Sequence, residues 1–180
     1  MILSLIRRAA LVALAALSFA APALAEGKPH WMLTLKDGVV DIELLPEIAP
    51  NHVARIIELT GKGFYNGIVF HRVIDGFMAQ GGDPTGTGMG GSDLPDLKAE
   101  FTDKAKFVRG TVGAARSQDP DSANSQFFIM FADADWLDGQ YTIFGQVASG
   151  MEFVDAIKKG EGDQPVVDPD KIISATIEYK

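Results

Sequence analysis

The sequence contains no cysteine and only three histidines among its 180 residues. Without cysteine, neither a disulfide framework nor a thiol nucleophile is available, so packing alone must hold the fold together. The histidines His30, His52 and His71 are far apart in the chain, and none has metal-ligand spacing with another. We therefore expect no metal site.

A membrane-spanning apolar run is also missing. The apolar run at residues 9–20 is shorter than the roughly 20 residues that a helix needs to cross a bilayer. It follows Arg7 and Arg8 and precedes Ala-Leu-Ala at residues 23–25, which is the layout of a signal peptide. We expect cleavage after Ala25 and export to the periplasm, with secretion as the alternative destination. The competing interpretation is an uncleaved helix that anchors the chain to a membrane.

Positive charge is scarce, with 16 basic residues against 24 acidic ones. Residues 1–25 carry two of the basic residues and none of the acidic ones, so the remainder has 14 against 24, a net charge of −10. This balance argues against nucleic acid as a partner. Residues 26–180 contain no internal repeat, linker or low-complexity tract. We expect them to form one domain, monomeric and free of the membrane after cleavage.

Short apolar runs separated by turn residues predict about eight strands. An Asp-Gly turn at residues 37–38 predicts that the first two strands form a hairpin. Two helices are expected, one over residues 50–60 and one that begins near Met151 and ends at Gly160. With so few helices the fold class is all-β, a closed eight-stranded antiparallel barrel with two capping helices. The strands are expected at residues 31–35, 39–44, 69–73, 77–80, 111–115, 126–131, 142–147 and 172–179.

The densest motif is Phe-His-Arg-Val-Ile-Asp-Gly-Phe-Met-Ala-Gln-Gly-Gly-Asp at residues 70–83. Strand alternation places Arg72 on one face and His71 on the other, and a turn at residues 75–76 returns the chain beside Arg72. On the residues alone, Arg72 could equally be a surface ion-pair partner. By the same reasoning, the apolar residues Phe77, Met78 and Phe128 could be ordinary core.

Two further motifs follow in order. They are Asn-Ser-Gln-Phe-Phe-Ile at residues 124–129 and Trp-Leu-Asp-Gly at residues 136–139, the latter followed by Phe-Gly at residues 144–145. With these three blocks the chain resembles the cyclophilins of exported bacterial type over residues 32–180. The resemblance implies a peptidyl-prolyl cis/trans isomerase that assists folding in the manner of a chaperone. The implied catalytic residues are Arg72 and Gln80, and the implied substrate-binding residues are Phe77, Met78, Gly88, Ala115, Arg116, Gln126, Phe128, Trp136, Leu137 and Tyr141.

Two positions depart from the best-known pattern of that family. Arg116 stands where many members have Asn, and Tyr141 stands where many have His. The loop over residues 83–88 is one residue shorter than usual, so Pro84, Thr85 and Thr87 receive no binding role. These departures leave the expected activity in place, while the substrate preference is not predicted.

Rotation about an X-Pro bond crosses a barrier of about 20 kcal/mol without making or breaking a covalent bond. We therefore expect the site to need no nucleophile, no metal ion and no cofactor. Arg72 would donate a hydrogen bond to the amide nitrogen as the bond twists, inside a dry apolar slot. Gln80 would orient Arg72 or hold the rotating carbonyl. Because no proton is transferred, we interpret His71 as a structural, hydrogen-bonded histidine.

The expected partners are proline-containing segments of folding polypeptides, and cyclosporin. Family members with Trp at the position of Trp136 tend to bind cyclosporin well, although Arg116 and Tyr141 alter the other wall. The glycine-rich run 81–88 lacks a following Gly-Lys-Ser/Thr and does not predict phosphate binding. A barrel that holds an apolar ligand is disfavoured by the large apolar strand residues. A proline-binding module without turnover remains the main alternative, and Arg72 favours the enzyme.

Overall fold

The computed structural model of this chain describes residues 27–180. The expected signal peptide and its cleavage after Ala25 lie outside the described residues. Within residues 27–180, the helices are too short or too polar to span a bilayer.

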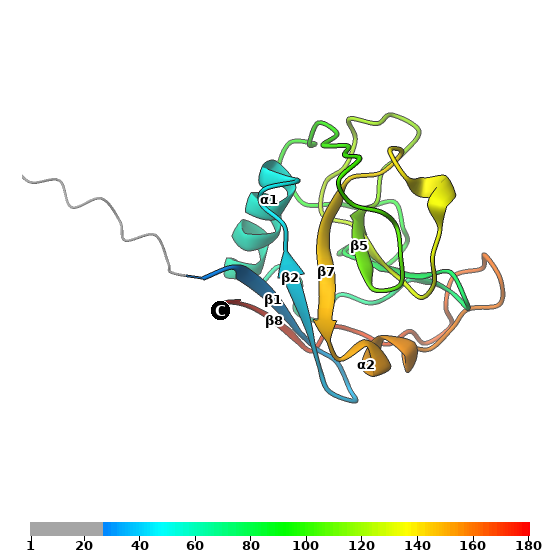
Figure 1. Cartoon of the computed structure of the whole chain (residues 1–180). Helices are drawn as coiled ribbons and strands as arrows, with labels where there is room; N and C mark the ends of the chain where they lie inside the picture. Colours follow the sequence, from blue (N-terminus) through cyan, green and yellow to red (C-terminus); the bar gives the residue numbers. More distant parts are fainter. Residues whose placement is uncertain (1–26) are drawn as a thin grey trace, which may run out of the picture.

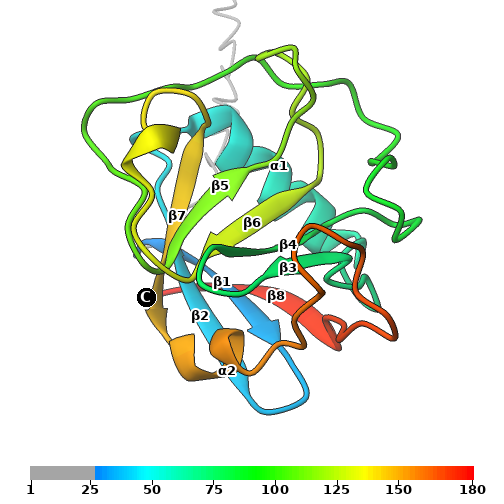
Figure 2. The same ribbon diagram turned by 90° about the vertical axis from the view of Figure 1, so that its right-hand side faces the viewer.

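One antiparallel sheet of eight strands makes up most of the fold, in the order β3-β4-β6-β5-β7-β2-β1-β8 (Figures 1 and 2). The sheet curls around a core, and the two helices lie at opposite ends of it (Figure 1). The elements are β1 (Pro29–Thr34), β2 (Val39–Leu44), α1 (Pro50–Gly61), β3 (Arg72–Ile74), β4 (Met78–Gly81), β5 (Thr111–Ala114), β6 (Phe127–Met130), η1 (Asp135–Leu137), β7 (Ile143–Ser149), α2 (Met151–Asp155) and β8 (Ser174–Tyr179).

The expected strand number and the opening hairpin are confirmed, but closure of the barrel by a continuous ladder is not observed. Strand pairing among the described residues ends at β3 on one side and at β8 on the other. The segments that precede these two strands meet at a single bridge between Val69 and Lys171. Backbone bonds from Gly67 to Ile172 and from Phe70 to Asp170 flank that bridge. The sheet is therefore curled, and its two edges are joined by the backbone contacts around Val69 and Lys171.

Most predicted elements differ from the observed ones by a few residues at their ends. The strand expected over residues 69–73 begins only at Arg72, and the one expected over residues 172–179 begins at Ser174. The helix expected to reach Gly160 ends at Asp155. The reason is tertiary, because the backbone N–H of Gly160 donates to the carbonyl of Val73 at 2.8 Å and draws this segment to the edge of β3.

Alternation along β6 divides the interior into two apolar clusters. Phe127 and Ile129 point into the main core, where Phe127 meets Trp31 edge-on at a centroid distance of 4.8 Å. Phe128 and Met130 point to the other side and form a second cluster. Fully buried aromatic rings fill the main core, among them Trp31, Tyr65 and Phe127.

Helix α1 begins at Pro50, which needs no backbone donor at this position, but its N-cap residue provides no side-chain cap. The cap comes from the long loop between β4 and β5. The carboxylate of Glu100 accepts the backbone N–H groups of Asn51 and His52 at 3.1 and 3.0 Å, and His52 Nδ1 lies 2.6 Å from it. A distant glutamate therefore does what a local Ser or Asp usually does.

Candidate active site

Four neighbouring strands of the sheet, in the order β3-β4-β6-β5, bring the expected catalytic residues into one row. Arg72 of β3 lies directly opposite Gln80 of β4, which lies opposite Phe128 of β6, which lies opposite Gly113 of β5. Directly paired residues project from the same face of a sheet, so this row forms a continuous strip across the second cluster. Figure 2 shows the four strands side by side. The prediction that the chain returns beside Arg72 is confirmed.

The apolar slot expected from the sequence would lie over this strip. Its expected floor residues Met78 and Phe128 are almost fully buried, and Leu137 of η1 belongs to the same apolar cluster. Trp136 has 64% of its surface exposed, and its ring centroid is 6.1 Å from that of Phe77. An exposed indole near an apolar cluster can cover a small apolar ring such as pyrrolidine.

Gly113 explains how Phe128 reaches its position, and the sequence-based reasoning missed it. A Cβ atom at Gly113 would lie 2.6 Å from the tip of the Phe128 ring and 2.8 Å from Phe107. The rings of Phe128 and Phe107 are stacked at a centroid distance of 5.6 Å. The absence of a side chain in β5 is therefore required for the floor of the slot, and a glycine within a predicted strand was the available signal.

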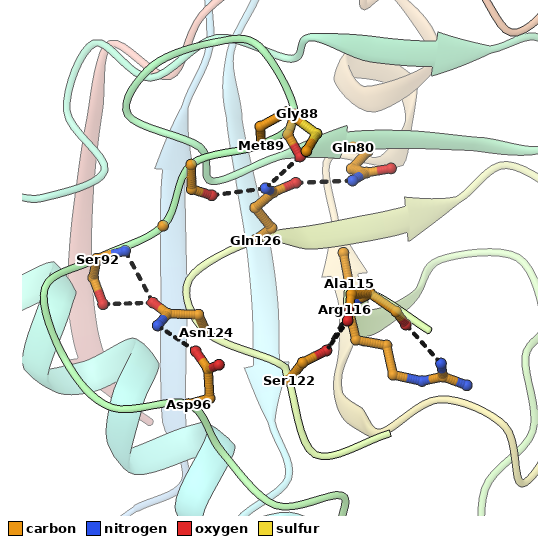
Figure 3. Close-up of a pocket in the computed structure, with 13 residues that line it drawn as sticks. Gln80, Gly88, Met89, Ser92, Asp96, Ala115, Arg116, Ser122, Asn124 and Gln126 are labelled. Atoms are coloured by element: carbon orange, nitrogen blue, oxygen red, sulfur yellow. Dashed lines mark hydrogen bonds between the residues drawn. The ribbon is translucent and has the colours of Figure 1, made fainter. Parts of the chain in front are cut away.

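Gln80 of the strip is bonded to a second glutamine, Gln126, which lies just before β6. Gln80 Nε2 donates to Gln126 Oε1 at 2.9 Å, and Gln126 Nε2 donates to the carbonyls of Gly88 and Gly90 at 3.0 and 2.8 Å (Figure 3). Gln126 thereby holds the glycine-rich loop against the sheet. Within residues 27–180 no hydrogen bond joins Gln80 to Arg72, so the expected orienting contact between them is not observed. A role for Gln80 in holding the substrate carbonyl remains a prediction.

A cavity of about 480 Å³ opens beside this glutamine pair (Figure 3). Of its lining, the sequence predicted Gln80, Gly88, Ala115, Arg116 and Gln126. The other lining residues were missed, although Asn124 lay in a recognised motif. They are Met89, Gly90, Gly91, Ser92, Asp96, Ser117, Ser122 and Asn124.

The two positions that depart from the family pattern contact each other. The guanidinium of Arg116 lies over the ring of Tyr141, 4.5 Å from its centroid, and donates to the carbonyl of Gln140 at 2.7 Å. The ring of Tyr141 in turn meets Phe128 edge-on at 5.7 Å. Arg116 and Tyr141 therefore pack together beside Phe128.

Asp83 organises the glycine-rich loop. Its carboxylate is buried and accepts the backbone N–H groups of Thr85, Thr87 and Gly88 at 2.8, 3.0 and 2.6 Å. Burial acts to raise the pKa of Asp83, but these hydrogen bonds outweigh it and lower the pKa to about 2. Thr85 and Thr87 are thus committed to the loop, which agrees with leaving them without a binding role.

His71 lies on the opposite strand face from Arg72, as predicted, but its expected hydrogen bonding is wrong. Only 5% of His71 is exposed, and neither ring nitrogen has a hydrogen-bond partner among the described residues. Burial lowers the pKa of His71, so the ring is neutral at pH 7. Its ring packs closely against Gly88, where an added Cβ would lie 3.3 Å away. His71 therefore supports the loop by packing.

Arg72 itself is half-buried, and its guanidinium is paired with an acidic residue that the sequence-based reasoning missed. Its Nη2 donates to Oδ1 of Asp163 at 2.6 Å, while the Asp163 side chain is 78% exposed. Asp163 lies in the segment between α2 and β8, outside all three recognised motifs. No local signal marked it, because 91 residues separate it from Arg72.

Comparisons with known proteins agree with this geometry. Residues 31–177 match the family described as cyclophilin type peptidyl-prolyl cis-trans isomerase/CLD. The chain is 53% identical over 188 residues to a probable peptidyl-prolyl cis-trans isomerase of Brucella suis, covering 97% of this chain and 95% of that one. It is 40% identical to the human peptidyl-prolyl cis-trans isomerase-like 1, covering 82% and 91% of the two chains.

Solved structures give the same result. A cyclophilin type isomerase of Cryptosporidium parvum, crystallised in the presence of the dipeptide Ala-Pro, is similar with a TM-score of 0.77 and 29% identity, covering 84% of this chain and 99% of that one. Cyclophilin AquaCyp293 of Hirschia baltica is similar with a TM-score of 0.73 and 30% identity, covering 82% and 73% of the two chains. The family match spans most of the chain and the relatives agree on the activity, so this chain belongs to the cyclophilin-type peptidyl-prolyl cis-trans isomerases.

Proposed function

We propose that this isomerase accelerates rotation about X-Pro bonds in exported polypeptides while they fold in the periplasm. The observation that supports it best is the strip formed by Arg72, Gln80 and Phe128. In this strip Arg72 and Phe128 are both paired with Gln80, and Phe128 belongs to the second apolar cluster. The signal-peptide layout of residues 1–25 supports the exported location.

The slot supplies the first part of the rate acceleration. Pyrrolidine would lie on Met78 and Phe128, with Leu137 and Trp136 at its side. Out of water, the planar and charge-separated form of the amide loses its solvation, so the twisted form becomes relatively easier to reach. A turnover in milliseconds requires about 6 to 7 kcal/mol of differential stabilisation in total, more than one apolar contact provides.

Arg72 supplies the second part. When the X-Pro bond twists, the nitrogen becomes pyramidal and basic, and only then can it accept a hydrogen bond. The Nη2 group of Arg72 is engaged by Asp163, while Nε and Nη1 have no bond to another described residue and can serve the substrate. A contact that forms only in the transition state raises kcat and leaves affinity nearly unchanged. Gln80 would hold the rotating carbonyl from the neighbouring strand.

The test is exchange NMR on an Ala-Pro peptide with the purified protein at micromolar concentration. We expect cis/trans exchange to accelerate, and to do so equally with a chelator present, because the rotation requires no metal. Unchanged exchange with measurable peptide binding would instead support a proline-binding module. The export part is tested separately by the N-terminal sequence of protein recovered from periplasm, which is expected to begin at Glu26.

A further inference from the structure

The partner of Arg72 is held in place by the segment that follows α2. β3 is an edge strand of the sheet, and the chain between α2 and β8 runs along its free side (Figure 2). The backbone N–H of Val166 donates to the carbonyl of His71 at 3.0 Å, and that of Gly160 donates to the carbonyl of Val73 at 2.8 Å. These two bonds attach the segment on either side of Arg72.

Packing reinforces that attachment. Val166 is buried in the main core, which anchors the far end of the segment. Gly160 allows the segment to fold closely on itself at the near end, because a Cβ there would lie 2.7 Å from the carbonyl oxygen of Gln164. Asp163 stands between these two fixed points and faces the guanidinium of Arg72. Its position is therefore set by backbone bonds and buried surface, although its own side chain is exposed.

We propose that Asp163 is a positioning residue for Arg72 in the isomerase reaction. This inference rests on the catalytic role proposed for Arg72. An arginine has a long side chain with many rotamers, and ordering it during the reaction lowers the rate. Gln80, the cross-strand neighbour of Arg72, is bonded to Gln126 and does not restrain it. Asp163 restrains it through one donor, and the remaining donors stay available to the substrate.

The central variant is Asp163→Asn, which removes the charge with little change in shape. The matched control is Glu161→Gln, which removes the same charge from the same segment without touching Arg72. We measure kcat and KM separately on an Ala-Pro peptide at low ionic strength. An exposed ion pair contributes modestly, so we expect kcat to fall about two- to five-fold in Asp163→Asn with KM nearly unchanged. Glu161→Gln is expected to retain the wild-type values.

Three further readouts separate positioning from a general structural effect. Asp163→Glu keeps the carboxylate on an exposed segment and should recover most of the lost kcat. High salt should slow the wild type toward Asp163→Asn while leaving that variant unchanged, because salt screens an exposed pair. The NMR order parameter of the Arg72 Nε–H group should decrease in Asp163→Asn.

Several results would overturn the inference. If kcat is unchanged in Asp163→Asn while Arg72→Ala is slow under the same conditions, Asp163 does not position Arg72. The proposed catalytic role of Arg72 is unaffected by that result. A faster Asp163→Asn shows that the carboxylate competes with substrate for Arg72. An equal loss of kcat in Glu161→Gln shows that the effect comes from the net charge of the segment and not from contact with Arg72. If Arg72→Ala itself turns over normally, the proposed role of Arg72 fails, and the positioning inference fails with it.

Discussion

Replacement of Glu100 with Ala tests whether a residue from a distant loop stabilises helix α1. The Glu100 carboxylate accepts four hydrogen bonds, two from Asn51 and two from His52, and one of these donors is the buried His52 ring. In Glu100→Ala the helix loses the side-chain cap that Glu100 provides, and its own N-cap residue supplies none. His52 Nδ1 also loses its partner, although just 3% of the His52 side chain is exposed.

The expected loss follows from these contacts. A lost N-cap costs about 1 kcal/mol, and a buried donor left without a partner costs about 1–3 kcal/mol. We therefore expect Glu100→Ala to lower the free energy of unfolding by about 2–4 kcal/mol. For a domain of this size, each kcal/mol shifts Tm by about 2–4 °C, so Tm falls on the order of 10 °C. Glu100→Gln keeps one acceptor oxygen and should lose about half as much free energy.

Urea unfolding followed by tryptophan fluorescence measures the loss, with Glu58→Gln as control. Glu58 carries the same charge as Glu100 and lies in α1, where it pairs with the exposed Lys62. The urea midpoint of Glu58→Gln should therefore hardly differ from that of the wild type. A loss below about 1 kcal/mol in Glu100→Ala, or one matched by Glu58→Gln, would refute the capping argument.

The pH dependence of the same pair has a definite sign. Burial opposes ionisation of Glu100, but hydrogen bonds from His52 and Asn51 outweigh it and hold its pKa below 4.5. Burial lowers the pKa of His52 below 6.5, and Glu100 offsets this only in part. Both folded-state pKa values are lower than in the unfolded chain, so both contributions are lost as pH falls. Wild-type stability should decline below pH 6.5, and its advantage over Glu100→Ala should shrink only below pH 4.5, where Glu100 becomes protonated.

Three predictions concern the slot. Arg72→Lys and Arg72→Ala should each lower kcat at least ten-fold, while the peptide affinity measured by titration changes less than three-fold. Near-full turnover in Arg72→Lys would contradict a role for the planar guanidinium group. Trp136→Phe should weaken cyclosporin binding in a fluorescence or calorimetric titration, because the indole donor is lost while the apolar contact stays; equal affinities would remove that argument. Gly113→Ala should displace Phe128 and reduce kcat/KM more than stability, and wild-type kinetics in that variant would show that the floor can adapt.

Local patterns were sufficient for much of the fold. The Asp-Gly turn, the alternation of β1 and β2 and the Pro at the start of α1 are properties of neighbouring residues, and each predicted element was found. The antiparallel return from Arg72 to Gln80 also follows from a short turn and a period of two. The residues expected along this strip were therefore found in one row.

Long-range contacts account for what the sequence did not reveal. The early end of α2, the capping of α1 by Glu100, the pairing of Arg116 with Tyr141 and the bond from Arg72 to Asp163 each join segments whose local patterns say nothing of each other. The ring of His71 shows the same limit, because strand alternation gave its face while only packing decided that its nitrogens have no protein partner. By itself, the amino-acid sequence determined which strands form and which side chains share a face, since both follow from local backbone geometry. Only the tertiary structure decided which charged group meets which, since that depends on how loops up to 91 residues away are fastened to the edge of the sheet.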